Sequence, residues 1–265
     1  MIVGKGGDGR ISHSYDGVYW SNVGAEQGGP GMQRVKWLNG RFVAVGGSGQ
    51  GGISISTDGA SWEQSKVVDL PAGWGEYPIG SSSLRDVAWG DEMYLAMGEG
   101  FSGIYYMETG AGKPNVWKRR ENRDDIIAYG LTFGKGVFVA VGPNTIKTIT
   151  KNNFLNNKQW TNRSPGGNYT LNSVAWNGSI FVAVGDSSAI YTSADAVTWT
   201  KRNAPSAGKT LHDVQWVPRH NCFYVAASDL IFKSSDGVNW TSIEPKNPNG
   251  TRMNANSHFW SIFGR

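Results

Sequence analysis

The chain of 265 residues is poor in cysteine and in charge. Its single cysteine, Cys222, excludes a disulfide within the chain and a cysteine-based zinc cluster. Charged residues make up 17% of the sequence, too few for a coiled coil or a long helical bundle. The four histidines are not spaced as metal ligands. We therefore expect no metal site and no cofactor.

Long apolar runs and targeting segments are also missing. No stretch reaches the ~18 apolar residues of a membrane span, and residues 1–7 lack the order of a signal peptide. We expect synthesis in the cytoplasm without a signal peptide, and no membrane insertion. The net charge is only +4, and the basic residues 118–120 are followed at once by acidic ones. This mixture is typical of a solvated surface and predicts no nucleic-acid binding.

Glycine and tryptophan, in contrast, are abundant, with 37 and 12 residues. They belong to one recurring pattern: apolar-x-Trp, a Gly-containing turn, Phe-Val-Ala-Val-Gly, a polar turn and Ser-x-Asp-Gly-x-x-Trp. Two aromatic series mark the repeat, each returning about every 44 residues. The first series is Trp37, Trp89, Phe133, Trp176, Trp216 and Trp260. The second is Trp20, Trp62, Trp117, Trp160, Trp199 and Trp240.

Each period has the pattern of four short strands separated by Gly, Asn and Asp turns, with almost no helix. A four-stranded repeat of this length predicts an all-β, six-bladed β-propeller with four antiparallel strands per blade. We expect a single domain over residues 1–265, with blades at about 32–66, 84–120, 128–163, 171–203 and 211–243. Residues 1–23 and 254–265 would share the sixth blade, so that N- and C-terminal strands close the ring.

The Ser-x-Asp-Gly-x-x-Trp segments at 14–20, 56–62 and 234–240, with a weaker copy at 193–199, carry a family resemblance. They resemble the Asp-box (BNR repeat) of sialidase-like β-propellers, in a form one residue shorter between Asp and Gly. The resemblance implies that the aspartates are structural turn residues, because a short Asp side chain accepts backbone N–H bonds across a turn. These aspartates are Asp16, Asp58, Asp195 and Asp236.

Candidate ligand-binding residues lie just before the first strand of each repeat, where we expect them to surround the mouth of the central channel. They are Arg34, Arg85, Asp86, Tyr129, Asn172, His212 and Asp213. The turns after the second strand add Glu99, Asn144, Asp186 and Asp229. Such a polar ring is suited to a sugar or an anionic group. No residue is assigned a catalytic role.

The longest departure from the repeat is an insertion at residues 67–83, which contains Trp74 and Tyr77. Aromatic side chains on a loop of a rigid scaffold are typical of binding sites. We expect Trp74 and Tyr77 to contact a partner or a glycan. The alternative is a loop that only caps its own blade.

Three functions remain open. We favour a non-enzymatic interaction or structural protein, in particular a bacteriophage virion component such as a tail or tip protein, whose composition is similar. It would contact other virion proteins or a receptor and be incorporated into the virion. The second function is a lectin-like propeller that binds a surface glycan. The third, which the family resemblance implies, is a sialidase-like exo-glycosidase. Its candidate residues are Arg34, Arg85 and Arg252 with Tyr129 and either Asp86 or Asp213.

Overall fold

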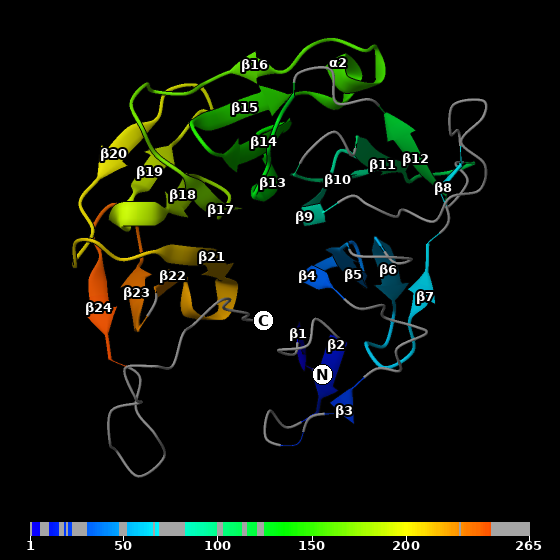
Figure 1. The fold of residues 1–265 in the computed structure, drawn as a ribbon, viewed down its shortest axis with the longest axis horizontal. Helices are drawn as coiled ribbons and strands as arrows, with labels where there is room; N and C mark the ends of the chain where they lie inside the picture. Colours follow the sequence, from blue (N-terminus) through cyan, green and yellow to red (C-terminus); the bar gives the residue numbers. More distant parts are fainter. Residues whose placement is uncertain are drawn as a thin grey trace. The chain divides into compact units, whose positions relative to one another are not determined.

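The structure is a computed structural model, and it consists almost entirely of antiparallel β-sheets (Figure 1). It describes residues 2–5, 11–15, 19, 21–22, 31–47, 52–65, 67–68, 83–99, 103–112, 116–120, 125–227 and 229–244. The chain divides into two compact units, unit 1 (Met1–Ala128) and unit 2 (Tyr129–Arg265). Each unit is described by itself.

The described residues of unit 1 form three sheets. The first consists of β1 (Ile2–Lys5), β2 (Ile11–Ser14) and β3 (Ser21–Asn22). The second consists of β4 (Met32–Leu38), β5 (Arg41–Gly46), β6 (Ile53–Ser56) and β7 (Glu63–Gln64). The third consists of β9 (Ser83–Gly90), β10 (Met93–Glu99), β11 (Ile104–Glu108) and β12 (Trp117–Arg120), with β8 (Val67–Val68) added parallel to β12.

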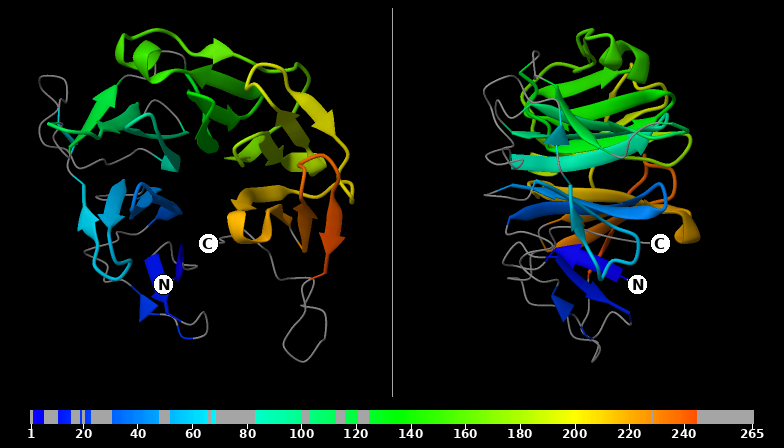
Figure 2. Two further views of the ribbon diagram at one scale, coloured as in Figure 1. Left: turned by 180° about the vertical axis from the view of Figure 1, so that it is seen from behind. Right: turned by 90° about the vertical axis from the view of Figure 1, so that its right-hand side faces the viewer.

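The described residues of unit 2 form three sheets of four antiparallel strands, each in sequence order. The first consists of β13 (Gly130–Gly134), β14 (Val137–Gly142), β15 (Thr145–Ile149) and β16 (Thr161–Asn162). The second consists of β17 (Leu171–Trp176), β18 (Phe181–Gly185), β19 (Ile190–Ser193) and β20 (Thr200–Arg202). The third consists of β21 (Leu211–Val217), β22 (Cys222–Ala227), β23 (Leu230–Ser234) and β24 (Thr241–Ile243). Within the unit, the first strands of the three sheets pack side by side, with β17 between β13 and β21. The fourth strand of each sheet lies at the other edge of its sheet (Figure 2).

The predicted four-stranded antiparallel sheets are therefore confirmed, but the expected number is not. The described residues hold five such blades and not six. Sheet β1–β3 has three strands, and the strand that we expected from residues 254–265 lies outside the described residues. The expected closure of a sixth blade is thus absent from the part of the chain that the structure describes.

The repeated Trp and Phe residues form the core between neighbouring blades. In the blade β17–β20, the Phe181 ring lies between Trp176 and Trp199, with ring centroids 4.1 Å and 6.1 Å away. Phe181 and Trp199 also belong to one buried cluster with Val139 and Val141 of the preceding blade. Because each aromatic residue buries a large apolar area, these groups are a main source of stability.

The glycine that ends the second strand has a steric role. A Cβ atom on Gly185 would lie 1.8 Å from the Thr170 carbonyl oxygen, and one on Gly46 would lie 2.4 Å from the Met32 Cα. The two strand ends therefore approach so closely that no side chain fits between them. This contact explains why Phe-Val-Ala-Val is followed by Gly in the repeat.

The Ser-x-Asp turns (residues 56–58, 193–195 and 234–236) connect the third and fourth strands of three blades. In the first, Asp58 Oδ1 accepts hydrogen bonds from the backbone N–H groups of Ala60 (2.9 Å) and Ser61 (2.8 Å) and from the Ser56 hydroxyl (3.0 Å). The Trp62 indole N–H donates to the Gly59 carbonyl at 2.9 Å. Asp195 and Asp236 make the equivalent bonds. Asp16, the fourth predicted member, lies outside the described residues.

These hydrogen bonds lower the pKa of the turn aspartates. The backbone N–H groups of Ser61 and Ala60 lower the pKa of Asp58 to about 2. Those of Thr198 and Val197 lower the pKa of Asp195 to about 2. At Asp236, burial opposes ionisation, but the Asn239, Val238 and Ser234 hydrogen bonds outweigh it, and the pKa is well below the ordinary value.

The blade β13–β16 replaces this turn with a short helix that the repeat pattern does not predict. Helix α2 (Lys151–Leu155) begins after Thr150, whose hydroxyl accepts a hydrogen bond from the Asn153 N–H at 3.2 Å. Phe154 on this helix is buried. In this blade, where the Ser-x-Asp pattern is absent, the buried Phe154 side chain holds the connection between the third and fourth strands against the core.

Candidate functional site

A β-bulge recurs in the first strand of four blades, close to its beginning. In each case one residue has no partner on the second strand, because its two neighbours pair with consecutive residues there. The bulged residues are Gln33, Arg85, Asn172 and His212, and all four are partly exposed. Since a bulge redirects a side chain, each of these blades presents one polar group at its edge. Three of the four belong to the predicted channel-mouth set.

The residue that follows the bulge lies between blades instead. In unit 1, Asp86 is fully buried, and its Oδ1 atom is 2.7 Å from Lys36 Nζ and 3.7 Å from Arg34 Nε of the preceding blade. The Val87 backbone N–H also donates to this oxygen at 2.8 Å. The structure thus places Asp86 and Arg34 in a contact between blades and not on an open rim, because a buried carboxylate requires such partners.

Unit 2 shows the same arrangement around Asp213. The carboxylate is fully buried and accepts a hydrogen bond from the Ser173 hydroxyl of the preceding blade at 2.7 Å. The Gln215 side-chain amide donates to the same oxygen at 3.3 Å. Asp213 therefore has a structural role between the two blades, although the sequence placed it among the ligand-binding candidates.

Two of the bulged side chains, Arg85 and Asn172, contact the residue at the end of the second strand or directly after it. Arg85 Nη2 lies 2.5 Å from Glu99 Oε1, in a partly exposed ion pair. The Asn172 side-chain N–H₂ group donates to Asp186 Oδ1 at 3.0 Å and to the Leu211 carbonyl at 3.0 Å. Tyr129, directly before β13, is partly exposed, and its backbone N–H donates to Val141. His212 is also partly exposed.

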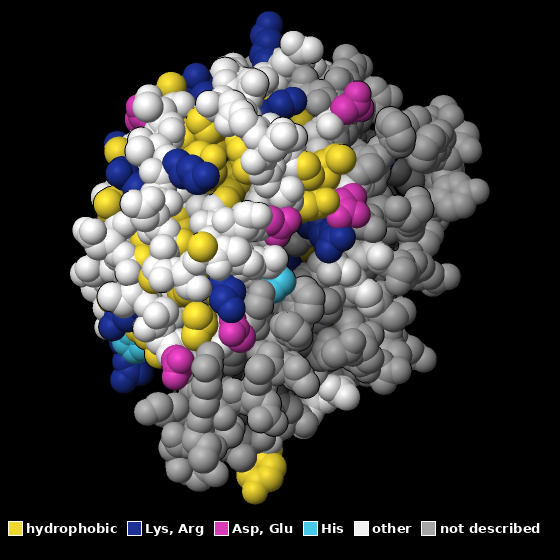
Figure 3. Space-filling model, turned by 60° about the vertical axis from the view of Figure 1, so that its left-hand side comes forward, with side chains coloured by type: hydrophobic (Ala, Val, Ile, Leu, Met, Phe, Trp, Pro, Cys, Tyr) yellow, Lys and Arg dark blue, Asp and Glu magenta, His cyan; other side chains and the backbone are white. Residues whose placement is uncertain are grey.

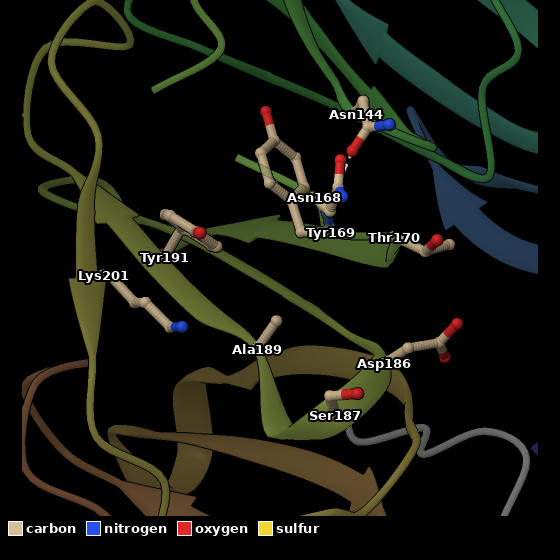
Figure 4. A pocket seen from close by; sticks show the side chains of 9 residues that line it. All are labelled: Asn144, Asn168, Tyr169, Thr170, Asp186, Ser187, Ala189, Tyr191 and Lys201. Atoms are coloured by element: carbon tan, nitrogen blue, oxygen red, sulfur yellow. Dashed lines mark hydrogen bonds between the residues drawn. The ribbon is translucent and has the colours of Figure 1, made fainter. Parts of the chain in front are cut away.

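A cavity of about 320 Å³ adjoins the Asn172–Asp186 hydrogen bond in unit 2. Nine residues of the β13–β16 and β17–β20 blades and the segments beside them line the cavity (Figure 4). They are Asn144, Asn168, Tyr169, Thr170, Asp186, Ser187, Ala189, Tyr191 and Lys201. Figure 4 shows Lys201 and Asp186 on opposite sides, with Ala189 between them. We call this space the unit 2 cavity.

Two tyrosines supply the aromatic surface of the unit 2 cavity. The Tyr169 and Tyr191 rings are 5.2 Å apart between centroids and tilted by 45°. Asn144 fixes the segment that carries Tyr169, since its side-chain oxygen accepts from the Tyr169 N–H at 2.9 Å. Burial raises the pKa of both tyrosine hydroxyls above the ordinary value of 10.0. Both hydroxyls therefore remain protonated hydrogen-bond donors near neutral pH.

The sequence identified only part of this cavity. Asn144 and Asp186 were expected near the channel mouth, and Asn172, another candidate, holds Asp186 in place. Tyr169, Tyr191 and Lys201 were missed, because they look like ordinary strand and loop residues in the repeat. One signal was present in the sequence: residues 186–188 form a polar Asp-Ser-Ser turn without glycine. In the structure, Ser187 and Ser188 of this turn have positive φ angles of 52° and 58°.

The predicted partner-binding residues Trp74 and Tyr77 lie outside the described residues, as does Arg252. The first residues of the same insertion form β8, which pairs with β12 of the blade that follows it. At least this part of the insertion covers a blade edge. Within the described ranges, no group of three or more His, Cys, Asp and Glu residues is placed to hold a metal ion. No helix in that part of the chain has the length and apolar character of a membrane span.

Comparison with known proteins identifies the fold. No protein-family model matches the chain, and no curated protein matches it. Among solved structures, virginiamycin B lyase from Staphylococcus aureus matches with a TM-score of 0.61 and 12% identity over 83% of this chain and 71% of the other. YCF48 bound to D1 peptide matches with a TM-score of 0.56 and 16% identity, over 90% and 75%. The fold is a β-propeller.

A third propeller match extends over nearly the whole chain. The extracellular domain of the putative hybrid two component system BT4673 from B. thetaiotaomicron has a TM-score of 0.64 and 12% identity. The match covers 99% of this chain and 35% of the other chain. At such low identities these similarities establish the propeller fold, and the function has to be argued from the site.

Proposed function

We propose that this β-propeller is a non-enzymatic binding protein that recognises a partner protein through its bulged first-strand residues and the turns beside them. The main support is that neighbouring polar residues differ in exposure: one is buried between blades and the one before it is partly exposed. Asp86 and Asp213, the carboxylates considered for catalysis, are buried in contacts between blades. The bulged residues Arg85, Asn172 and His212 stay partly exposed. An edge of this kind is suited to polar recognition, since loops and strand ends on a rigid scaffold carry most binding contacts.

Surface charge and the comparisons support a protein partner. Among the described residues on the face shown in Figure 3, basic and acidic side chains are interspersed, without a large basic field. Nucleic-acid binding usually needs such a field. One similar structure, YCF48, is named as bound to a peptide. Another similar protein, virginiamycin B lyase, is an enzyme by name, so the fold alone is compatible with either kind of function.

We further propose that the partner belongs to a bacteriophage virion, with this chain as a tail or tip component. The support is compositional: many Gly, Asn, Ser and Trp residues, few charges and one cysteine. The test is the position of the gene and the content of purified particles. We expect the gene among tail or capsid genes and the protein in the particles, and its absence from both would contradict the virion role.

A photo-crosslinking experiment tests the binding function. A photo-reactive amino acid replaces His212 on the bulge in one variant and Val197 in another. Val197 is 47% exposed and lies in a Ser-x-Asp turn, so it is a matched surface control. We expect one defined protein adduct from position 212 and none from position 197. Equal adducts from both positions would contradict the proposal. So would turnover of a fluorogenic sialoside that is lost on Arg85→Ala, which would favour the exo-glycosidase.

We also propose that residues 254–265 complete the sheet β1–β3 as the sixth blade. The support is that this sheet has three described strands and that residues 257–260 match the pattern that opens the other repeats. Trp260 would then correspond to Trp216. We expect Trp260→Ala and Trp216→Ala to lower the unfolding free energy by similar amounts, about 3 kcal/mol each. A Trp260→Ala variant as stable as the parent would contradict the closure.

A further inference from the structure

Several polar groups in the unit 2 cavity keep hydrogen-bonding capacity. Asp186 Oδ1 accepts from Asn172, whereas Asp186 Oδ2 accepts no hydrogen bond within the described residues. Lys201 Nζ, across the cavity, has no ion pair or hydrogen bond there either. The buried Tyr169 hydroxyl lies beside the Ser164 side chain but forms no hydrogen bond of good geometry in the described part. Since polar groups in such positions normally have partners, the space that these three residues line is suited to a polar ligand.

The turn that carries Asp186 is held in one conformation. Ser187 and Ser188 are in the left-handed region, which costs about 1 kcal/mol for each non-glycine residue. The Ser188 hydroxyl stabilises the turn by donating to the Ser206 carbonyl at 2.7 Å, and it accepts from the Lys209 N–H at 2.9 Å. The backbone N–H of Asp186 also donates to the Thr170 carbonyl at 2.9 Å. The cavity wall is therefore preorganised, which reduces the entropy cost of binding.

Size and charge restrict the class of ligand. A volume of about 320 Å³ is at the small end of the range for ligand pockets and is suited to a ligand the size of one sugar ring. The charges of Asp186 and Lys201 balance each other, which favours a neutral ligand. The tilted Tyr169 and Tyr191 rings offer an apolar surface beside these polar groups. A pyranose has the same combination, with C–H groups on its ring faces and hydroxyls around its edge.

We propose that the unit 2 cavity binds one neutral pyranose residue, such as the terminal hexose of a glycan. Asp186 Oδ2 would accept from a sugar hydroxyl, Lys201 would donate to a sugar oxygen, and the tyrosine rings would pack against the sugar ring. This proposal goes beyond the protein-binding function and does not depend on it. The two can therefore fail separately.

The test uses the full chain and four methyl glycosides as probes: those of glucose, mannose, galactose and N-acetylglucosamine. Saturation-transfer NMR detects binding, and titration gives the Kd. We expect at least one glycoside to bind in the millimolar range or tighter. Asp186→Asn keeps an oxygen for the Asn172 hydrogen bond and removes the charge, and Lys201→Met keeps the length of the side chain. We expect each to weaken binding about tenfold or more, because a hydrogen bond to a charged group is lost.

Asp91→Asn and Lys147→Met are the matched controls, since neither residue lines the cavity, and we expect them to leave the Kd unchanged. A glycan array separates the sources: signals confined to glycans that end in the bound sugar would support recognition of a chain terminus. Equal signals for glycans that carry this sugar only at internal positions would overturn that assignment. Absence of binding by all four glycosides would overturn the proposal, as would binding that Asp186→Asn and Lys201→Met leave intact. A peptide that binds the cavity in place of any glycoside would also overturn it.

Discussion

The strand β19 lies between two aspartates that are used in opposite ways. Asp195, after the strand, accepts three hydrogen bonds on one oxygen, and two of them come from backbone N–H groups of its own turn. Asp186, before the strand, accepts one hydrogen bond, from Asn172, and lines the unit 2 cavity. Asp195 uses its hydrogen-bonding capacity within its own turn, whereas Asp186 retains an oxygen that can accept from a ligand. Both residues are aspartates close to the ends of one strand, so the difference comes from the turn in which each lies.

The two turns also differ in how they reach the left-handed conformation. The Ser-x-Asp turn of this blade has a single such residue, Ala196, with a φ of 62°. The turn at Asp186 has two in succession, Ser187 and Ser188, held by contacts with residues 206 and 209. The regular Ser-x-Asp turn, which is repeated in several blades, contributes to stability. The irregular turn at Asp186, which contacts from other segments hold in place, lines the cavity that we propose as a binding site.

The largest effect expected is from Gly185→Ala, directly before Asp186. The new Cβ would lie 1.8 Å from the Thr170 carbonyl oxygen, so β17 and β18 would have to separate. We expect a loss of about 3 kcal/mol in unfolding free energy, measured by urea denaturation. Gly178→Ala is the control, because its Cβ meets no atom within 4 Å and only its positive φ of 101° is unfavourable. It should cost about 1 kcal/mol; equal losses would contradict the steric explanation.

The next effect separates the two aspartates directly. Asp195→Ala removes the acceptor of three hydrogen bonds, and we expect it to cost about 1 kcal/mol, because the freed N–H groups are exposed and bind water instead. Asp186→Ala should cost about 0.5 kcal/mol or less while abolishing sugar binding. Thermal denaturation and the glycoside titration measure the two quantities. A larger stability loss at Asp186 than at Asp195 would contradict the division of roles.

A smaller effect is expected from acid. The folded-state pKa values of Asp58 and Asp195, about 2, are below the ordinary 3.8, so the unfolded chain binds more protons at pH values between the two. The stabilisation by these groups is complete above about pH 4 and is lost as the pH falls towards 2. Urea unfolding at pH 4 and at pH 2 measures this loss. In Asp195→Asn the loss should be smaller, and an unchanged loss would mean that Asp195 does not contribute.

The smallest effect is expected from Ala196→Gly. Glycine relieves the left-handed strain, worth about 1 kcal/mol, but the substitution also removes a buried methyl group, worth about 0.8 kcal/mol. We expect a net change below 0.5 kcal/mol. The variant also tests the Trp199 indole N–H, which has no hydrogen-bond acceptor among the described residues, unlike Trp62 and Trp240. A clear gain in stability would show that glycine restores this bond.

The sequence predicted what depends on local pattern. Alternating apolar residues and Gly-containing turns predicted antiparallel four-stranded units, and the five sheets confirm this. The bulges were not predicted, because a bulge depends on the register between the first and second strands of a blade. The burial of Asp86 depends on Lys36, which belongs to another blade. Helix α2 was missed since it replaces one turn in one repeat.

The unit 2 cavity was beyond sequence reasoning for a related reason. Its tyrosines come from a segment before β17 and from β19, and neither position carries a distinctive motif. Only the fold brings the Tyr169 ring to within 5.2 Å of Tyr191. Asn144 and Asp186 were found because they follow a strand that the repeat made recognisable.

The small strand β8 has a consequence for solubility. The outermost strand of a blade exposes unpaired backbone groups that can recruit another chain, and natural sheets restrict this by keeping such strands short. Strands β3, β7 and β16 have two residues, and β20 and β24 have three. Strand β12 has four, and it is the one that β8 covers. The chain thus protects its longest described outer edge with its own backbone, which is a safeguard against sheet-to-sheet aggregation.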